Sequence, residues 1–255
     1  MRGPRSFLAL LLLVVSAACS SPAPVDAPQR SAAPPARAMD IATAVARLPM
    51  LPSRGTLVVR ATGRHFLVYR EPGSPLTWKL LADNPWDQPL EFPVLGTLRA
   101  PDGAPWLRVA LPIRPNGTTG WVKAADVRWH RIDQRIVVDL SQHTLWRYVD
   151  GRMVRQLSVA VGAPSTPTTP GSFFVWARVT YAHPNGPYGA AALGLSGFSR
   201  VLTNWPGGGR LAIHGTANPG DIGRDVSHGC VRVDNPDLLA YLRGVPLGTP
   251  VVIRP

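Results

Sequence analysis

From about residue 55 onward, the chain consists of short runs in which apolar and polar residues alternate. Successive side chains of a β-strand point to opposite faces, so each run predicts a strand with one buried face. Turn sequences at 71–73 (Glu-Pro-Gly) and 114–117 (Arg-Pro-Asn-Gly) separate runs in the first half. The strands predicted there are 56–60, 65–70, 93–98, 106–111 and 120–122. Five short strands over about seventy residues predict a small β-barrel.

The second half continues this pattern, with strands predicted at 136–140, 144–148, 154–161, 172–180, 211–213 and 251–253. The pair Asp150 and Gly151 is a hairpin-turn signal. Residues 185–204 are rich in Gly, Ala and Ser with little periodicity, which predicts a long surface excursion. Residues 236–242 predict a helix, with Asn235 as its cap and Pro236 in its first turn.

The composition favours short strands, because 28 prolines and 24 glycines are too many for a helical protein. With 255 residues, of which 45% are apolar, the chain can form one medium domain or two small ones. The segment 106–117, followed by Gly-Trp-Val at 120–122, resembles the end of a bacterial SH3-like domain. We therefore expect an SH3-like β domain at 55–130 and a second domain at 134–254.

The first residues are typical of an export signal, and we expect a signal peptide at 1–18. Arg2 and Arg5 precede the apolar run at 7–15, which is too short to span a bilayer. Small residues and then Cys19 follow, as in a lipobox, where cleavage exposes a cysteine for lipid attachment. The match is imperfect, since serine stands three positions before the cysteine instead of a larger aliphatic residue. The alternative is simple secretion, with Cys19 incidental.

A Pro/Ala-rich stretch predicts a linker over 19–54, in which 40–47 is either a short helix or more tether. We expect a monomer in the bacterial cell envelope, held to the membrane by its N-terminal lipid and facing the wall. If the lipobox is not used, the protein is secreted instead.

The formal net charge of +12 favours anionic partners, such as nucleic acid, an anionic membrane surface or an acidic wall polymer. However, the basic residues are spread along the chain, without the cluster or aromatic platform of a nucleic-acid interface. Together with the export signal, this argues against nucleic acid as a partner.

The two cysteines direct attention to the C-terminal half. If Cys19 carries lipid, Cys230 has no partner within the chain, and an unpaired thiol in an exported protein calls for an explanation, of which catalysis is one. His214 precedes Cys230 by 16 positions, and the Gly- and Pro-containing loop between them allows the chain to fold back. Only a thiolate attacks a carbonyl, and an imidazole can accept the thiol proton and return it to a leaving amine.

The neighbours of Cys230 suggest a turn shaped for a substrate. Gly229 permits a tight turn and close approach of a substrate to backbone amides that stabilise an oxyanion. Arg232 lies two positions after Cys230, so both face one side of an extended chain, and it is a candidate for holding a substrate carboxylate or the loop carbonyls. His228 is left open as a second base, a turn-stabilising donor or a solvated residue.

The run 213–232 resembles the signature of the L,D-transpeptidase family, whose catalytic domain is of the YkuD type. The matching positions are His214, Gly215, Ser227, His228, Gly229, Cys230 and Arg232. Segments at 137–141, 169–173 and 248–253 resemble the opening, middle and last strand of that domain, so the likeness covers about 134–253. It implies a mainly β fold in which the small barrel is followed by a YkuD-type β-sandwich or barrel with one or two short helices.

This resemblance implies an activity on peptidoglycan stem peptides. Cys230 would attack the amide before the terminal D-Ala of a tetrapeptide stem, with His214 as proton acceptor and donor. D-Ala leaves, and an amine of a neighbouring stem resolves the acyl-thioester as a 3→3 cross-link. Supporting, oxyanion or substrate roles are implied for His228, Gly229, Ser227, Arg232 and Gly215, and no metal or organic cofactor is expected.

Other interpretations fit less well. A buried structural thiol at Cys230 conflicts with its polar neighbours. A zinc site built from His214, His228 and Cys230 lacks a fourth ligand nearby in sequence. A papain-like cell-wall endopeptidase or carboxypeptidase places cysteine before histidine, the reverse of the order here. A non-catalytic wall-binding lipoprotein should have lost the thiol or its base, and both are present.

Overall fold

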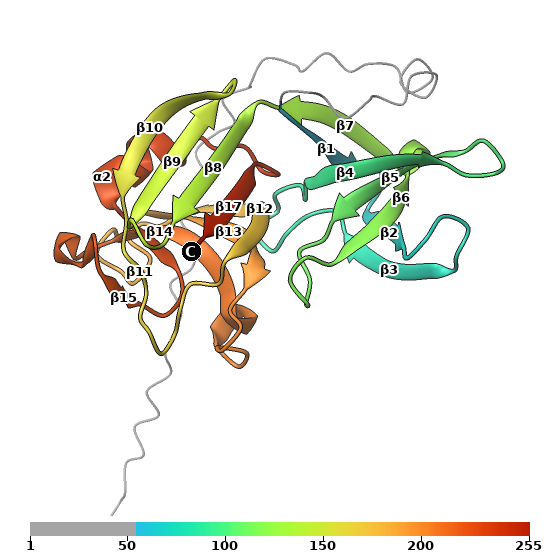
Figure 1. Ribbon diagram of the computed structural model, residues 1–255. Helices are drawn as coiled ribbons and strands as arrows, with labels where there is room; N and C mark the ends of the chain where they lie inside the picture. The colour runs from blue at the N-terminus through green and yellow to red at the C-terminus, as the bar shows by residue number, and fades with distance from the viewer. Residues whose placement is uncertain (1–54) are drawn as a thin grey trace, which may run out of the picture.

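The computed structural model describes residues 55–255 of the chain. The expected signal peptide, Cys19, the linker and the segment 40–47 all lie outside the described residues. Figure 1 shows two β units, the N-terminal one in cyan and green and the C-terminal one in yellow to red. Within residues 55–255, no helix is long and apolar enough to cross a membrane. The mainly β fold is confirmed by the succession of strands.

The N-terminal unit is a seven-stranded antiparallel sheet in the order β3-β2-β6-β5-β4-β1-β7. Its strands are β1 (Thr56–Ala61), β2 (His65–Tyr69), β3 (Leu76–Leu81), β4 (Phe92–Arg99), β5 (Pro105–Ala110), β6 (Thr119–Lys123) and β7 (Val127–Ile132), with the 3-10 turn η1 (Ala124–Asp126) before β7. The pattern of the sequence predicts all of them except β3 and β7. In β3 no residue is fully buried, and in β7 only the two end residues are, so neither strand alternates clearly. The likeness of this unit to SH3 domains stays a prediction.

The C-terminal unit holds an eight-stranded sheet in the order β10-β9-β8-β17-β12-β13-β14-β16, and β11 pairs separately with β15. Its strands are β8 (Gln134–Asp139), β9 (Thr144–Val149), β10 (Arg152–Ser158), β11 (Val161–Gly162), β12 (Gly171–Thr180), β13 (Ala191–Phe198), β14 (Arg210–Thr216), β15 (Asp225–Ser227), β16 (Val231–Asp234) and β17 (Pro250–Arg254). The helical turns are η2 (Pro206–Gly209), η3 (Pro219–Asp221), α2 (Asn235–Asp237) and the π-helical turn η4 (Leu238–Leu242), which continues α2.

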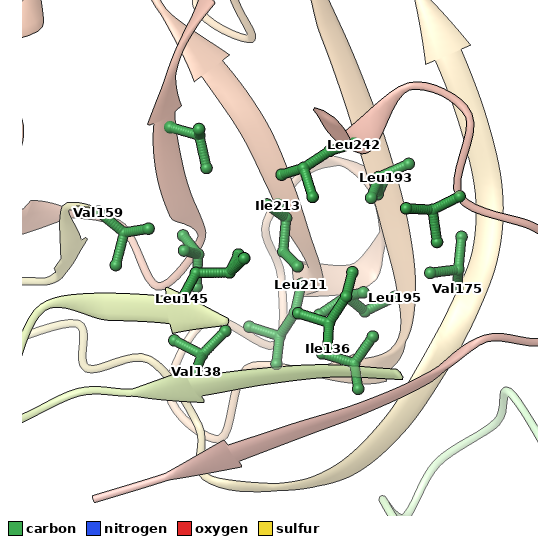
Figure 2. Close-up of a cluster of buried hydrophobic side chains, with 14 of the residues drawn as sticks. Ile136, Val138, Leu145, Val159, Val175, Leu193, Leu195, Leu211, Ile213 and Leu242 are labelled. Carbon is green, nitrogen blue, oxygen red and sulfur yellow. The ribbon is translucent and has the colours of Figure 1, made fainter. Parts of the chain in front are cut away.

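Aliphatic side chains from distant strands meet inside this unit (Figure 2). One buried cluster includes Ile136 of β8, Leu193 and Leu195 of β13 and Ile213 of β14. Each of these four side chains is at most 2% exposed. Burying these side chains is the main favourable term that holds the sheet together. It also fixes which face of β14 and its neighbours points away from the core.

The surface excursion predicted at 185–204 is wrong in part, because β13 runs through it. All but one residue of β13 are buried, so the strand reads as a run of small and apolar residues without alternation. Its glycines fit a crowded interior: a Cβ atom at Gly197 would lie 2.3 Å from the ring of Phe173. The small residues that predicted a loop therefore belong to a central strand.

The helix predicted at 236–242 is present as α2 and η4, but Asn235 is not its cap. Asn235 lies within α2, and Asp234 is the residue before the first turn. The side-chain oxygen of Asn235 accepts from the N–H of Ala190 (2.8 Å), and its amide donates to the carbonyl of Pro184 (3.1 Å). An asparagine before a proline looks the same in sequence whether it caps a helix or ties down a distant loop.

Strand β12 contributes to two cores at once. Phe173 and Val175 point into the core of the C-terminal unit, whereas Phe174 points the other way into the core of the N-terminal unit. There its ring lies 6.0 Å from that of Phe92, in edge-to-face geometry, and it is 1% exposed. The alternation of a single strand therefore joins the two units.

We expect Phe174→Ala to lower the free energy of unfolding by about 3–5 kcal/mol, because it leaves a cavity in a fully buried site. Denaturant titration of the purified protein measures this loss. Leu98→Ala, on an exposed position of β4, is the control and should cost no more than about 1 kcal/mol. Equal losses in the two variants would contradict the shared core.

Candidate active site

The register of two parallel strands brings His214 and Cys230 to one face of the sheet. In the pairing of β14 with β16, Ile213 lies opposite Val231 and His214 opposite Arg232. Ile213 and Val231 both point into the core, so their alternating neighbours point to the other side. Cys230 directly precedes β16 and falls on this outer side. A pocket opens there, and its lining includes His214, Cys230 and Arg232.

The turn before Cys230 is held by Ser227, which is 1% exposed. Its hydroxyl oxygen accepts from the N–H of Gly229 (3.1 Å), and its O–H donates to the carbonyl of Cys230 (2.6 Å). Gly229 has a φ of 107°, a conformation that side-chain-bearing residues rarely adopt. Ser227 and Gly229 therefore shape the turn that presents the thiol.

The imidazole of His214 is oriented by the backbone of the next residue. Its Nδ1 lies 2.7 Å from the carbonyl oxygen of Gly215. A carbonyl can only accept, so Nδ1 carries the proton of the neutral ring and Nε2 keeps a free lone pair. Burial lowers the pKa of His214 to about 4, with a further lowering by the charge of Arg232 and an opposing effect of the Gly215 hydrogen bond. At neutral pH the ring is an uncharged base.

The thiol of Cys230 is also uncharged at rest. Burial raises its pKa above the ordinary value, and this outweighs the lowering by a backbone hydrogen bond at Ala212 and by the charge of Arg232. The resting pair is thus a thiol and a neutral imidazole, and the proton has to move when a substrate arrives.

Gly215 has a packing role in addition to its carbonyl. A Cβ atom there would lie 2.0 Å from the side-chain oxygen of Asn235 and 3.0 Å from the nitrogen of Ala190. The absence of a side chain lets Asn235 of α2 pass close to β14 and accept from the N–H of Ala190, in the segment before β13. Gly215 was anticipated from the motif, but its partner Asn235 was missed.

Arg232 is paired rather than free. One of its terminal nitrogens lies 2.6 Å from a carboxylate oxygen of Asp221, which in turn accepts from the side-chain amide of Asn218 (2.8 Å). The Nε atom of Arg232 is buried and has no hydrogen-bond partner among the described residues. The guanidinium therefore keeps one buried donor without a partner in this part of the chain.

Aromatic rings form two walls of the pocket. Tyr188 packs edge-on against His214, with ring centroids 5.2 Å apart, and stacks on Tyr181. On the other side, Trp205 stacks on His228 at 5.0 Å, and both are exposed. Tyr188 and Trp205 were not anticipated from the sequence, since Tyr188 lies in the segment 185–204 interpreted as a surface excursion and Trp205 directly follows it.

Comparison with known proteins identifies this half of the chain. A family model described as the L,D-transpeptidase catalytic domain, of the YkuD type, matches residues 133–253. A protein named L,D-transpeptidase YkuD from Bacillus licheniformis is 40% identical over 124 residues, covering 49% of this chain and 67% of that protein. The YkuD protein of Bacillus subtilis is 35% identical over 125 residues, covering 49% and 68%. This chain belongs to the L,D-transpeptidase family.

Solved structures of L,D-transpeptidases are also similar over about half of this chain. A cysteine-to-serine mutant of the Enterococcus faecium enzyme is 26% identical, covers 48% of this chain and 49% of its own, and has a TM-score of 0.37. The Xylanimonas cellulosilytica enzyme is 27% identical, covers 48% and 60%, and has a TM-score of 0.34. The match thus spans about half of the enterococcal chain and about two thirds of the Bacillus relatives.

The L,D-transpeptidase signature positions differ in what the structure does with them. His214, Cys230 and Arg232 meet in the pocket, which Ser227 also lines while its hydroxyl bonds the turn backbone, and Gly215 acts through its carbonyl on His214. His228 lies at the rim under Trp205, and its ring makes no hydrogen bond within residues 55–255. No group of three or more His, Cys, Asp or Glu in that range is arranged to hold a metal ion.

We expect the rate of alkylation of Cys230 by iodoacetamide to rise with pH through an apparent pKa above that of an ordinary cysteine, about 8.5. The reason is burial of the thiol, which disfavours the thiolate. The measurement uses the full chain with Cys19→Ala, so that one thiol remains. The same protein in denaturant is the control and should titrate near the ordinary value. Full reactivity already below pH 7 would instead indicate a thiolate–imidazolium pair.

Proposed function

We propose that this protein is a peptidoglycan L,D-transpeptidase in which Cys230 is the nucleophile and His214 the general base and acid. The observation that carries the proposal is the placement of both side chains in one pocket on one face of β14 and β16. The free lone pair on Nε2 of His214 adds to it, because that atom can accept the thiol proton.

The first half-reaction transfers an acyl group to the enzyme. Nε2 of His214 takes the proton of the Cys230 thiol while Sγ forms a bond to the carbonyl carbon before the terminal D-Ala of a tetrapeptide stem. The carbon–nitrogen bond then breaks, and His214 gives its proton to the departing amine of D-Ala. An acyl-thioester on Cys230 and neutral His214 remain.

The second half-reaction returns the enzyme to its starting state. The amine of a neighbouring stem attacks the thioester carbonyl, His214 accepts one amine proton, and the carbon–sulfur bond breaks. The proton passes to Sγ, which restores the thiol. The product is a new amide, the 3→3 cross-link, and no cofactor takes part.

The other signature residues support these steps. Ser227 and Gly229 hold the turn that presents Sγ and brings backbone amides close to the developing oxyanion. Arg232 lines the pocket, and its guanidinium is suited to a substrate carboxylate or carbonyl. Gly215 keeps His214 in the tautomer that the reaction needs. His228, under Trp205, belongs to the rim that a substrate crosses.

We expect Cys230→Ala to abolish D-Ala release from a disaccharide tetrapeptide, and His214→Gln to reduce it by about 100-fold or more, the range of general base catalysis. Mass spectrometry of the reaction products measures both D-Ala release and 3→3 dimers. A carbapenem should add covalently to the wild-type protein at Cys230 and not to the alanine variant.

A histidine in the N-terminal unit provides the control, and His65→Gln should leave the reaction unchanged. Dimers formed by the Cys230→Ala protein would rule out the assigned nucleophile. An adduct located on any residue other than Cys230 would do the same.

The family indicates an extracytoplasmic location, and lipidation of Cys19 is our proposal for how the protein is held there. It rests on the charged start, the short apolar run and the small residues before the cysteine. The domain limits of 55–130 and 134–254, the SH3-like nature of the first unit and the monomeric state are part of the same proposal.

We expect Cys19→Ala to move the protein from the membrane fraction to the soluble fraction of the envelope, because a lipid chain supplies most of the membrane affinity. Immunoblotting of separated fractions measures the change, and Cys230→Ala serves as the matched control. Unchanged partitioning of the Cys19→Ala protein would count against the anchor.

A further inference from the structure

The connection between β5 and β6 of the N-terminal unit reaches the end of β13 in the C-terminal unit. The side-chain amide of Asn116 donates to the carbonyl of Phe198 (2.8 Å), and its oxygen accepts from the N–H of the same residue (2.9 Å). Asn116 thus pairs with the backbone of Phe198 as a neighbouring strand would. In the sequence, this stretch showed only a turn signal at 114–117.

Arg114, two residues earlier, ties together both ends of the loop that follows β13. One terminal nitrogen donates to the carbonyl of Ser199 (3.1 Å), and the other donates to the carbonyl of Gly208 (2.8 Å). The guanidinium also lies 4.6 Å from the ring centre of Phe198. A planar fork with two separate donors suits this bridge, which a lysine ammonium could not span in the same way.

A further tie runs from the first residue of β14 to the same connection. Arg210 donates to the carbonyl of Pro112 (3.2 Å) in the N-terminal unit and to that of Leu195 (3.2 Å) in β13. Its guanidinium lies between the rings of Trp176 and Phe198, at 4.0 Å and 4.3 Å. The segment 112–116 therefore contacts the loop 199–209 near its beginning, at Ser199, and near its end, at Gly208. It also contacts Arg210, the residue that follows the loop.

This loop has little stiffness of its own. Gly207, Gly208 and Gly209 follow one another with positive φ angles, a stretch of backbone with many alternative conformations. Within the loop, Ser199 donates its N–H to the carbonyl of Gly209 (2.7 Å), and its hydroxyl accepts from Leu202. Gly208 donates its N–H to the carbonyl of Trp205 within the loop (2.8 Å), and its own carbonyl accepts from Arg114 of the other unit.

The loop forms one wall of the catalytic pocket. Leu202 and Trp205 both line it, and Trp205 stacks on His228, two residues before Cys230. A loop that moved away from the sheet would carry Trp205 off His228 and open this side of the pocket. The position of the wall is therefore coupled to side chains of the N-terminal unit.

We propose that Arg114 and Asn116 are positioning residues of the active site, which hold the loop 199–209 so that Trp205 and Leu202 form the wall against which the substrate binds. The N-terminal unit thereby helps to form the pocket. This role is separate from any binding of the N-terminal unit to the cell wall. The proposal rests on the proposed transpeptidase function only where substrate turnover is measured.

The test compares Arg114→Ala, Arg114→Lys and Asn116→Ala with the parent, all in the full chain with Cys19→Ala. Hydrogen exchange of peptides covering 199–209 should become about tenfold faster in Arg114→Ala and Asn116→Ala, since each loses two hydrogen bonds. The second-order rate of acylation by a carbapenem should fall by about tenfold, and KM for the stem peptide should rise more than kcat falls. Arg114→Lys should resemble Arg114→Ala, because it keeps the charge and loses the fork.

Alkylation of Cys230 by iodoacetamide should continue in all three variants, because His214 and Cys230 are held by β14 and β16 and not by the loop. Its apparent pKa should stay the same or fall toward the ordinary value, because burial raises the thiol pKa and opening the wall reduces that burial. This readout separates loss of the wall from damage to the catalytic pair. A thiol pKa above that of the parent would show that the substitutions act on the pair itself and would overturn the proposal.

Gln88→Ala is the matched control. Gln88 makes the same two-bond contact between the units, with the backbone N–H and carbonyl of Arg178 in β12, but away from the pocket loop. Its loss should leave both loop exchange and acylation unchanged, as should Arg108→Ala at an exposed position of β5. Equal effects of Gln88→Ala and Asn116→Ala would show that the contact between the units is weakened in general, which would refute the proposal. Unchanged hydrogen exchange of the loop 199–209 in Arg114→Ala and Asn116→Ala would also refute it.

The two proposals fail in different ways. If the parent protein neither releases D-Ala nor reacts with a carbapenem, the transpeptidase function fails. Loop exchange and iodoacetamide alkylation still decide whether Arg114 and Asn116 hold the loop.

Discussion

The parallel pairing of β14 with β16 is the constraint on which the chemistry of this protein depends. Ile213 and Val231 lie side by side in the core, and their burial fixes the register of the two strands. A slip by one residue would turn His214 toward the core and an aliphatic side chain toward the pocket. His214 and Cys230 are thus brought to one face by hydrophobic burial behind them, and no attraction between imidazole and thiol is needed to assemble the pair.

The same burial sets the protonation of the pair. Both groups are neutral at rest because their surroundings disfavour charge, and the nearby cation Arg232 is paired with Asp221. The thiolate is also the form that oxidants attack. An exported enzyme that keeps its nucleophile as a thiol until a substrate is bound is therefore less exposed to inactivation in an oxidising compartment.

Sequence reasoning pointed to residues that the structure brings into one pocket where those residues lie close together in the chain. The run 213–232 led to His214, Cys230 and Arg232 because residue types and spacing within one loop carry the chemistry. It failed where a residue acts across the fold: Asn235 was taken for a helix cap, and Arg114 and Asn116 for a simple turn. Partners of this kind lie 45 to 85 positions away, so the local sequence pattern does not indicate them. Strand β13 was missed for another reason, since burial on both faces removes the alternation by which strands are recognised.

The strand β12 has a consequence for how this chain could have been assembled. Because Phe173 and Phe174 enter different cores, the C-terminal unit supplies part of the interior of the N-terminal unit. A catalytic half produced alone would present Phe174 to water, and an N-terminal unit exchanged for another would need a socket of matching shape. Exchanging either half for that of a relative therefore requires the contact at Phe174 to be rebuilt.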